Sequence, residues 1–137
     1  MRRSVQGDDF MTEKPVTLKP DTDLFHAIDV FLRHRISGCT VLDDNRNIVG
    51  VLSEMDCLKA IIDSTYHGTG VGGTVGEYMS KKVDVVPEHL DIIEVAQMLI
   101  DKNRRRIPIV ADDGSFVGQI SCRSILKAFK DFDVAKG

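Results

Sequence analysis

The sequence predicts an α+β fold in which one strand–helix–strand–strand–helix unit occurs twice. Three observations predict it: landmarks recur about 68 positions apart, strand and helix spacings follow the same order in each half, and the chain has only 137 residues. A unit of fewer than about 60 residues buries little apolar surface alone. We therefore expect the two units to pack through their small sheets as a pseudo-twofold pair, with two equivalent clefts between them as the binding sites.

The duplication is visible when the sequence is compared with itself at this distance, with shifts of a single residue allowed. Met11 matches Met79, Pro20 matches Pro87, and Asp23 matches Asp91. Residues 41–44 match 110–113, Val49-Gly50 matches Val117-Gly118, Ser53 matches Ser121, and Leu58-Lys59-Ala60 matches Leu126-Lys127-Ala128. The predicted organisation is a first repeat over 8–64, a Gly-rich linker over 65–76 and a second repeat over 77–132.

The elements of the first repeat follow from spacing. Residues 16–18 form a short strand that Pro20 ends, and Leu24, Ile28, Phe31 and Leu32 then form the buried stripe of a helix. Residues 39–42 and 48–52 are apolar runs joined by the polar turn 43–47, which indicates a hairpin. A final helix carries Leu58, Ile61 and Ile62.

The second repeat has the same order. Residues 83–86 form a strand before Pro87, and the helix stripe consists of Ile92, Ala96, Leu99 and Ile100. A hairpin joins 107–110 to 116–120 through the turn 112–115, and the last helix carries Ile125, Leu126 and Phe129.

Composition narrows the function classes. A net charge of −3 gives no general attraction to nucleic acid or anionic lipid. The three cysteines are widely spaced, the four histidines lack metal-ligand spacing, and no nucleophile–base set can be assembled, so we expect neither metal nor catalysis. No apolar signal region follows Met1, which together with the odd cysteine number favours a reducing, cytoplasmic setting.

Three landmarks point to a family. Met11-Thr12 and Met79-Ser80 begin the repeats, residues 107–110 read Ile-Pro-Ile-Val before an acidic turn, and residues 50–56 read Gly-x-x-Ser-x-x-Asp. In this order the chain resembles tandem CBS domains, the Bateman module. The resemblance implies a stand-alone, non-catalytic regulatory module that binds AMP, ADP, ATP or S-adenosylmethionine and signals to a partner protein. It also implies a homodimer, to which Phe10, Phe129 and Phe132 could contribute apolar contacts.

In such a module the carboxylate of Ser-x-x-Asp takes the ribose hydroxyls, and here that residue is Asp56, with Ser53. A carboxylate can accept hydrogen bonds from both hydroxyls, although the same pair could simply cap a helix. The second repeat has Ser124 in place of Asp56, so we expect unequal clefts, with the better ribose site at Asp56. The other nucleotide-binding residues implied are Thr17, Ser37, Gly38, Cys39, Val85, Arg105, Arg106, Ile107, Pro108, Ser121 and Arg123, with Cys39 taken as the counterpart of Pro108.

The run Arg104-Arg105-Arg106 leaves three interpretations open. In the resembled family, basic residues before this strand meet ligand phosphates, and the arginine fork suits a phosphate. The run could instead be a solvated surface, or it could bind nucleic acid. For the whole chain, the alternatives to a nucleotide sensor are a ligand-free dimeric scaffold and a nucleic-acid binder that uses Arg104–Arg106.

Overall fold

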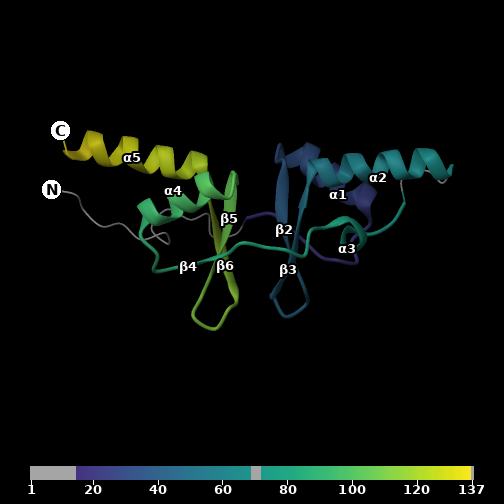
Figure 1. Ribbon diagram of the computed structural model, residues 1–137, viewed down its shortest axis with the longest axis horizontal. Helices are drawn as coiled ribbons and strands as arrows, with labels where there is room; N and C mark the ends of the chain where they lie inside the picture. Colours follow the sequence, from purple (N-terminus) through teal and green to yellow (C-terminus); the bar gives the residue numbers. More distant parts are fainter. Residues whose placement is uncertain (1–14, 69–71, 137) are drawn as a thin grey trace. The chain divides into compact units, whose positions relative to one another are not determined.

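The computed structural model describes residues 15–68 and 72–136, with the backbone alone for 67 and 132–136. The described chain forms two compact units, one of Val16–Val83 and one that begins at Asp84 and also includes Pro15. Each contains a three-stranded sheet and its helices (Figure 1). The predicted α+β class is therefore confirmed. The pairing of the two sheets stays a prediction.

The first unit contains β1 (Thr17–Leu18), α1 (Leu24–His34), β2 (Gly38–Leu42), β3 (Ile48–Ser53), α2 (Glu54–His67) and the short α3 (Val75–Tyr78). The strand order is β1-β2-β3, with β1 parallel and β3 antiparallel to β2. The turn of the β2–β3 hairpin lies at the end of the sheet away from α1 and α2 (Figure 1).

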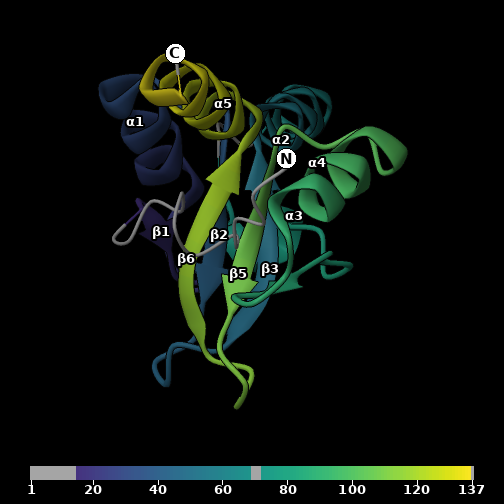
Figure 2. The same ribbon diagram turned by 90° about the vertical axis from the view of Figure 1, so that its left-hand side faces the viewer.

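The second unit repeats this plan with β4 (Val86–Pro87), α4 (Ile92–Asp101), β5 (Arg106–Val110), β6 (Phe116–Ser121) and α5 (Cys122–Lys136). Its strand order is β4-β5-β6, with the same parallel and antiparallel pairs. The β5–β6 hairpin runs from the start of α5 to a distant turn (Figure 2). The strand predicted over 83–86 is shorter than expected, since β4 begins at Val86.

Both first helices of the repeats begin at an aspartate cap. Asp23 accepts a hydrogen bond from the backbone N–H of His26, and Asp91 accepts one from Ile93. Each bond satisfies a backbone donor that the helix itself leaves unpaired. The match between Asp23 and Asp91 therefore marks the same structural position.

Strand register corrects the alignment of the two repeats. Gly38 pairs with Ser53 and Arg106 pairs with Ser121, while Leu42 pairs with Ile48 and Val110 pairs with Phe116. The repeats therefore correspond at a constant distance of 68 residues along both hairpins. The matches of Pro20 with Pro87 and of 41–44 with 110–113, which need a one-residue shift, are wrong. The counterpart of Pro108 is Thr40, not Cys39.

The buried stripes of the helices differ in part from those predicted. In α1 the buried residues are Leu24, Ala27 and Phe31, whereas Leu32 is exposed. In α4 Val95 is buried and Ile100 is exposed. The core positions of α2 are Cys57 and Ala60, while Leu58, Ile61 and Ile62 face outward. The side chains that α2 buries in the first core, Cys57 and Ala60, are therefore small.

The segment after the glycines packs on the first unit. Ser80 forms an antiparallel bridge with Val51, with both N···O distances 2.9 Å, and Val75 is fully buried in the first core. A Cβ atom on Gly50 would lie 2.8 Å from the Ser80 backbone oxygen, as well as 2.6 Å from Met79 Sδ, so a side chain there would push the bridged segment away. Residues 65–67 lie in α2. The expected linker 65–76 is thus ordered at both of its ends.

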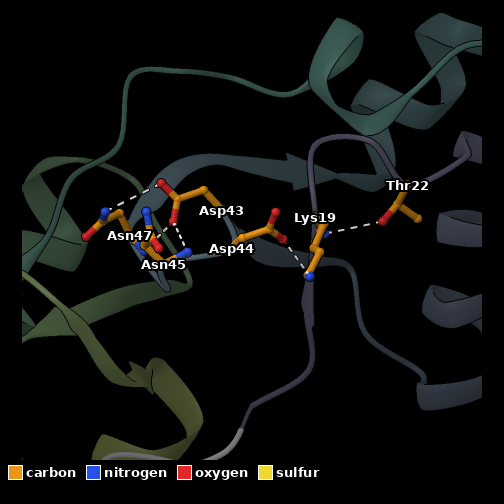
Figure 3. Close-up of polar contacts among 6 residues, drawn as sticks. All are labelled: Lys19, Thr22, Asp43, Asp44, Asn45 and Asn47. Atoms are coloured by element: carbon orange, nitrogen blue, oxygen red, sulfur yellow. Dashed lines mark hydrogen bonds and ion pairs between the residues drawn. The ribbon is translucent and has the colours of Figure 1, made fainter.

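A polar turn holds the far end of the first sheet. Asp43 Oδ1 accepts hydrogen bonds from the backbone N–H groups of Asn45 and Asn47, each at 2.9 Å, and Lys19 Nζ pairs with Asp44 at 2.7 Å (Figure 3). Both members of the Lys19–Asp44 pair are solvent-exposed, so it contributes little to stability.

In the described ranges, no helix is long and apolar enough to cross a bilayer.

Candidate functional site

Several predicted site residues of each repeat meet where the open end of the hairpin joins the second helix: Ser37, Gly38 and Ser53 in the first, and Arg105, Arg106 and Ser121 in the second. In the first unit the backbone N–H of Glu54 donates to the carbonyl of Ser37 at 2.9 Å, and Gly38 pairs with Ser53. The second unit has the same bond, from the Cys122 N–H to the Arg105 carbonyl at 2.8 Å. These bonds hold the start of one strand against the start of the helix, so residues far apart in sequence meet.

Asp56 and Ser53 form a reciprocal cap at the N-terminus of α2. Asp56 Oδ2 accepts hydrogen bonds from the Ser53 backbone N–H at 2.9 Å and from the Ser53 hydroxyl at 3.0 Å, and Ser53 Oγ is 3.2 Å from the Asp56 N–H. Among the described residues, none donates a hydrogen bond to the second carboxylate oxygen, Oδ1. The pair is half-buried, so one anionic oxygen is fixed in orientation and available as an acceptor.

The second repeat has the same cap without the charge. Ser124 Oγ accepts a hydrogen bond from the Ser121 N–H at 2.8 Å, and the Ser124 N–H donates to Ser121 Oγ at 3.1 Å. The Ser124 hydroxyl donates its own proton to the Ser121 carbonyl at 2.8 Å. Ser124 therefore reproduces the capping role of Asp56 but offers no anionic acceptor, which is the asymmetry expected from the sequence.

The two faces of the first sheet divide the predicted residues. Cys39 is buried in the core with Val41, so the intervening Thr40 points to the opposite face. Thr17 pairs with Thr40 in register and shares that face. Thr40 is itself buried, and an alignment anchored on Ser53 and Ser121 at a constant distance of 68 identifies it as the counterpart of Pro108. Cys39 could offer a ligand only its backbone.

The same division holds in the second sheet. The Ile107 side chain is in the core with Ile109, so it too could offer only its backbone, and Pro108 points to the other face. Val85 is partly exposed just before β4.

The arginines of the second unit differ in their surroundings. Arg104 Nε is 3.4 Å from Asp84 Oδ2, so its charge is partly neutralised. Arg105 and Arg123 are exposed near the start of α5, and no described residue forms an ion pair with either guanidinium. Arg106 begins β5 beside Ser121. The helix N-terminus and these guanidinium groups together favour a negatively charged ligand group.

One thiol lies directly beside the carboxylate. Burial, with smaller contributions from the charges of Asp56 and Glu54, raises the pKa of Cys57, so this cysteine stays a neutral thiol at pH 7. In the part of the chain that the structure describes, no three His, Cys, Asp or Glu side chains are grouped as metal ligands.

A family model matches the chain twice. The model of the CBS domain covers residues 7–63 and 75–131, one match for each repeat. The chain belongs to the CBS-domain family. The resemblance drawn from the repeated motifs is confirmed. Met11, Thr12 and Phe10 lie outside the described residues, as does the side chain of Phe132.

Solved CBS pairs have the same fold. The crystal structure of CBSX2 in complex with AMP superposes with a TM-score of 0.83 at 26% sequence identity, covering 93% of this chain and 98% of that one. A second crystal structure of this CBS-pair protein, from Arabidopsis thaliana, gives the same TM-score over 96% of this chain.

Sequence relatives place the repeats in longer chains. Inosine-5′-monophosphate dehydrogenase of Aquifex aeolicus is 31% identical over 121 residues, which are 88% of this chain and 24% of the enzyme. An uncharacterised 17.7 kDa protein of Acidianus ambivalens is 25% identical, over 88% of this chain and 70% of that protein. The chain thus spans about a quarter of the length of the dehydrogenase.

Proposed function

We propose that this CBS pair is a regulatory module that binds an adenosine-bearing ligand and has no catalytic role. One observation carries the proposal: Asp56 is held by Ser53 through one oxygen, which leaves Oδ1 to accept a ribose hydroxyl. The likeness to a CBS pair crystallised with AMP supports the same ligand class. Capping and ribose binding are compatible, because each uses a different oxygen of the same carboxylate.

The remaining residues are assigned by their chemistry. Arg105 and Arg106 take the ligand phosphates, since a guanidinium pairs with phosphate through two parallel hydrogen bonds. Backbone groups at Ser37 and Gly38, beside the Asp56 cap, complete the nucleoside-binding surface. The Ser121–Ser124 cap lacks a carboxylate, so the equivalent position of the second repeat binds ribose more weakly.

Thermal unfolding with adenosine, AMP, ATP, S-adenosylmethionine and a short RNA tests the proposal. A ligand at 100 times its Kd stabilises the folded state by about 2.7 kcal/mol, which gives a measurable rise in Tm. We expect a rise with at least one adenosine compound and none with the RNA. A rise with RNA alone would favour the nucleic-acid alternative. No rise with any compound would favour the dimeric scaffold, which the missing carboxylate at Ser124 supports.

The module signals to a partner protein and pairs with a second copy of itself. Ligand binding shifts the population of the module toward one conformation, which changes a surface that a partner can recognise. The module acts as a homodimer in the reducing cytoplasm, in keeping with the odd number and wide spacing of its cysteines. Mass spectrometry of the purified protein would identify a retained ligand, and capture experiments with and without that ligand would identify the partner.

A further inference from the structure

The first unit buries a hydroxyl to which the described chain offers no partner. Thr40 is only 3% exposed, and it is the one buried polar residue within residues 15–68 and 72–136. No residue in these ranges forms a hydrogen bond with its side-chain oxygen, Oγ1. Buried polar groups are almost always hydrogen-bonded, because an unpaired group has lost its bonds to water and gained none in return. The Thr40 hydroxyl therefore indicates a partner from outside the described chain.

The strand register places this hydroxyl near the carboxylate of the candidate site. Thr40 lies in β2 between two core residues, so its side chain points to the face of the sheet away from the core. Gly38 lies on the same face and pairs with Ser53, which caps α2 together with Asp56. Thr40 is two residues farther along the strand, roughly 7 Å from Gly38. A nucleoside whose ribose is held at Asp56 and which lies along β2 brings a second polar group to Thr40.

The neighbours of Thr40 across the sheet are uncharged. Thr17 of β1 and Val51 of β3 pair with it in register and share its face. The Thr17 hydroxyl likewise has no hydrogen bond to a described residue. A phosphate taken out of water needs a cationic partner, whereas a hydroxyl beside apolar surface suits a neutral ring with a polar edge. The group that meets Thr40 is therefore the base and not the phosphate.

The second unit presents different side chains at the three equivalent positions. At the 68-residue distance these are Val85, Pro108 and Gln119, and Pro108 pairs with Gln119 in register. Proline and valine side chains form no hydrogen bonds, so the polar side chain of this set lies on β6 instead of on the first two strands. The buried hydroxyl is thus a property of the first unit alone.

From these observations we propose that Thr40 recognises the base of the nucleoside that binds at the first unit. Its hydroxyl accepts a hydrogen bond from the exocyclic amino group of adenine, and this bond supplies the partner that the folded chain lacks. The inference rests on the proposed function and deepens it, because it names a residue that selects the base in addition to the one that holds the ribose.

Replacing Thr40 by valine tests the proposal, because valine has nearly the same shape and lacks the hydroxyl. In the absence of ligand, the urea midpoint of Thr40→Val should equal or exceed that of wild type, since no hydrogen bond is lost. The Kd for adenosine, measured by isothermal titration calorimetry, should rise about three- to tenfold because the bond to the base is lost. Thr40→Ser keeps a hydroxyl and should bind adenosine more tightly than Thr40→Val does.

Purine riboside, which is adenosine without the exocyclic amino group, identifies the atom that is bound. Wild type should bind adenosine about three- to tenfold more tightly than purine riboside, and Thr40→Val should bind the two ligands equally. A merely structural role of Thr40 would weaken both ligands by the same factor and leave their ratio unchanged.

Two results would overturn the inference while leaving the proposed function in place. One is an adenosine-to-purine-riboside ratio that is the same in wild type and Thr40→Val. The other is a clear loss of stability in ligand-free Thr40→Val, which would mean that the hydroxyl already has a partner in the folded chain. In both cases adenosine still binds to wild type. Wild-type protein that binds neither nucleoside would instead overturn the proposed function, and the base contact with it.

Discussion

Replacing Asp56 by serine, the residue at the equivalent position of the second repeat, removes the carboxylate but keeps the helix cap. In Asp56→Ser, the new hydroxyl can accept from the Ser53 N–H as Ser124 Oγ accepts from Ser121 at 2.8 Å. The cap is therefore kept, and the free energy of unfolding should fall by less than about 1 kcal/mol. The anionic acceptor at Oδ1 is lost.

The affinity should fall much more than the stability. A hydrogen bond to a charged group contributes about 1.5–3 kcal/mol, so the Kd for adenosine and for AMP should rise about 10- to 150-fold, and by the same factor for both ligands. Isothermal titration calorimetry measures the affinities, and urea unfolding measures the stability. Ser124→Ala is the matched control, which weakens the cap of α5 and leaves the carboxylate in place. Equal adenosine affinity for wild type and Asp56→Ser would refute the ribose assignment.

Three further predictions follow from the geometry. Arg106→Ala should weaken ATP about tenfold and adenosine little, because the guanidinium acts on phosphate; competition binding with both ligands checks the difference, and equal losses would contradict the assignment. Gly50→Ala should destabilise the first unit by about 1–3 kcal/mol in urea unfolding, since the added Cβ would lie 2.6 Å from Met79 Sδ; an unchanged midpoint would contradict this packing. In thiol titration Cys122 should react rapidly in the folded protein and the two buried cysteines only after unfolding, so three fast-reacting thiols would contradict the burial.

The candidate site could be read from the sequence only in part. Ser53 and Asp56 are close in sequence, so their spacing alone predicts that they meet at a helix start. The meeting of Ser37 and Gly38 with that helix start depends on how β2 and β3 pair, which spacing does not fix. Cys39 was matched with Pro108 in place of Thr40 because spacing does not fix the register, and a one-residue shift of a strand moves each side chain to the opposite face.

The buried side of α2 and the buried side of α5 could also be assigned only from the structure. Apolar spacing predicted two similar helices, but which side of each one is covered depends on the sheet beneath it. Cys57 and Ala60 are covered, and Leu58 is left exposed. Charges on the outer faces can be counted from the sequence only once those faces are known.

The sequence by itself determined the duplication, the order of strands and helices within each repeat, the Ser53–Asp56 cap and the loss of the carboxylate at Ser124, because each can be read from residue identities and from local spacing. Tertiary structure decided the strand register, the buried side of each helix and the packing of Val75 and Ser80 on the first unit. These features depend on contacts between distant segments, where the burial of apolar surface and the pairing of backbone groups choose among arrangements that local spacing leaves equal.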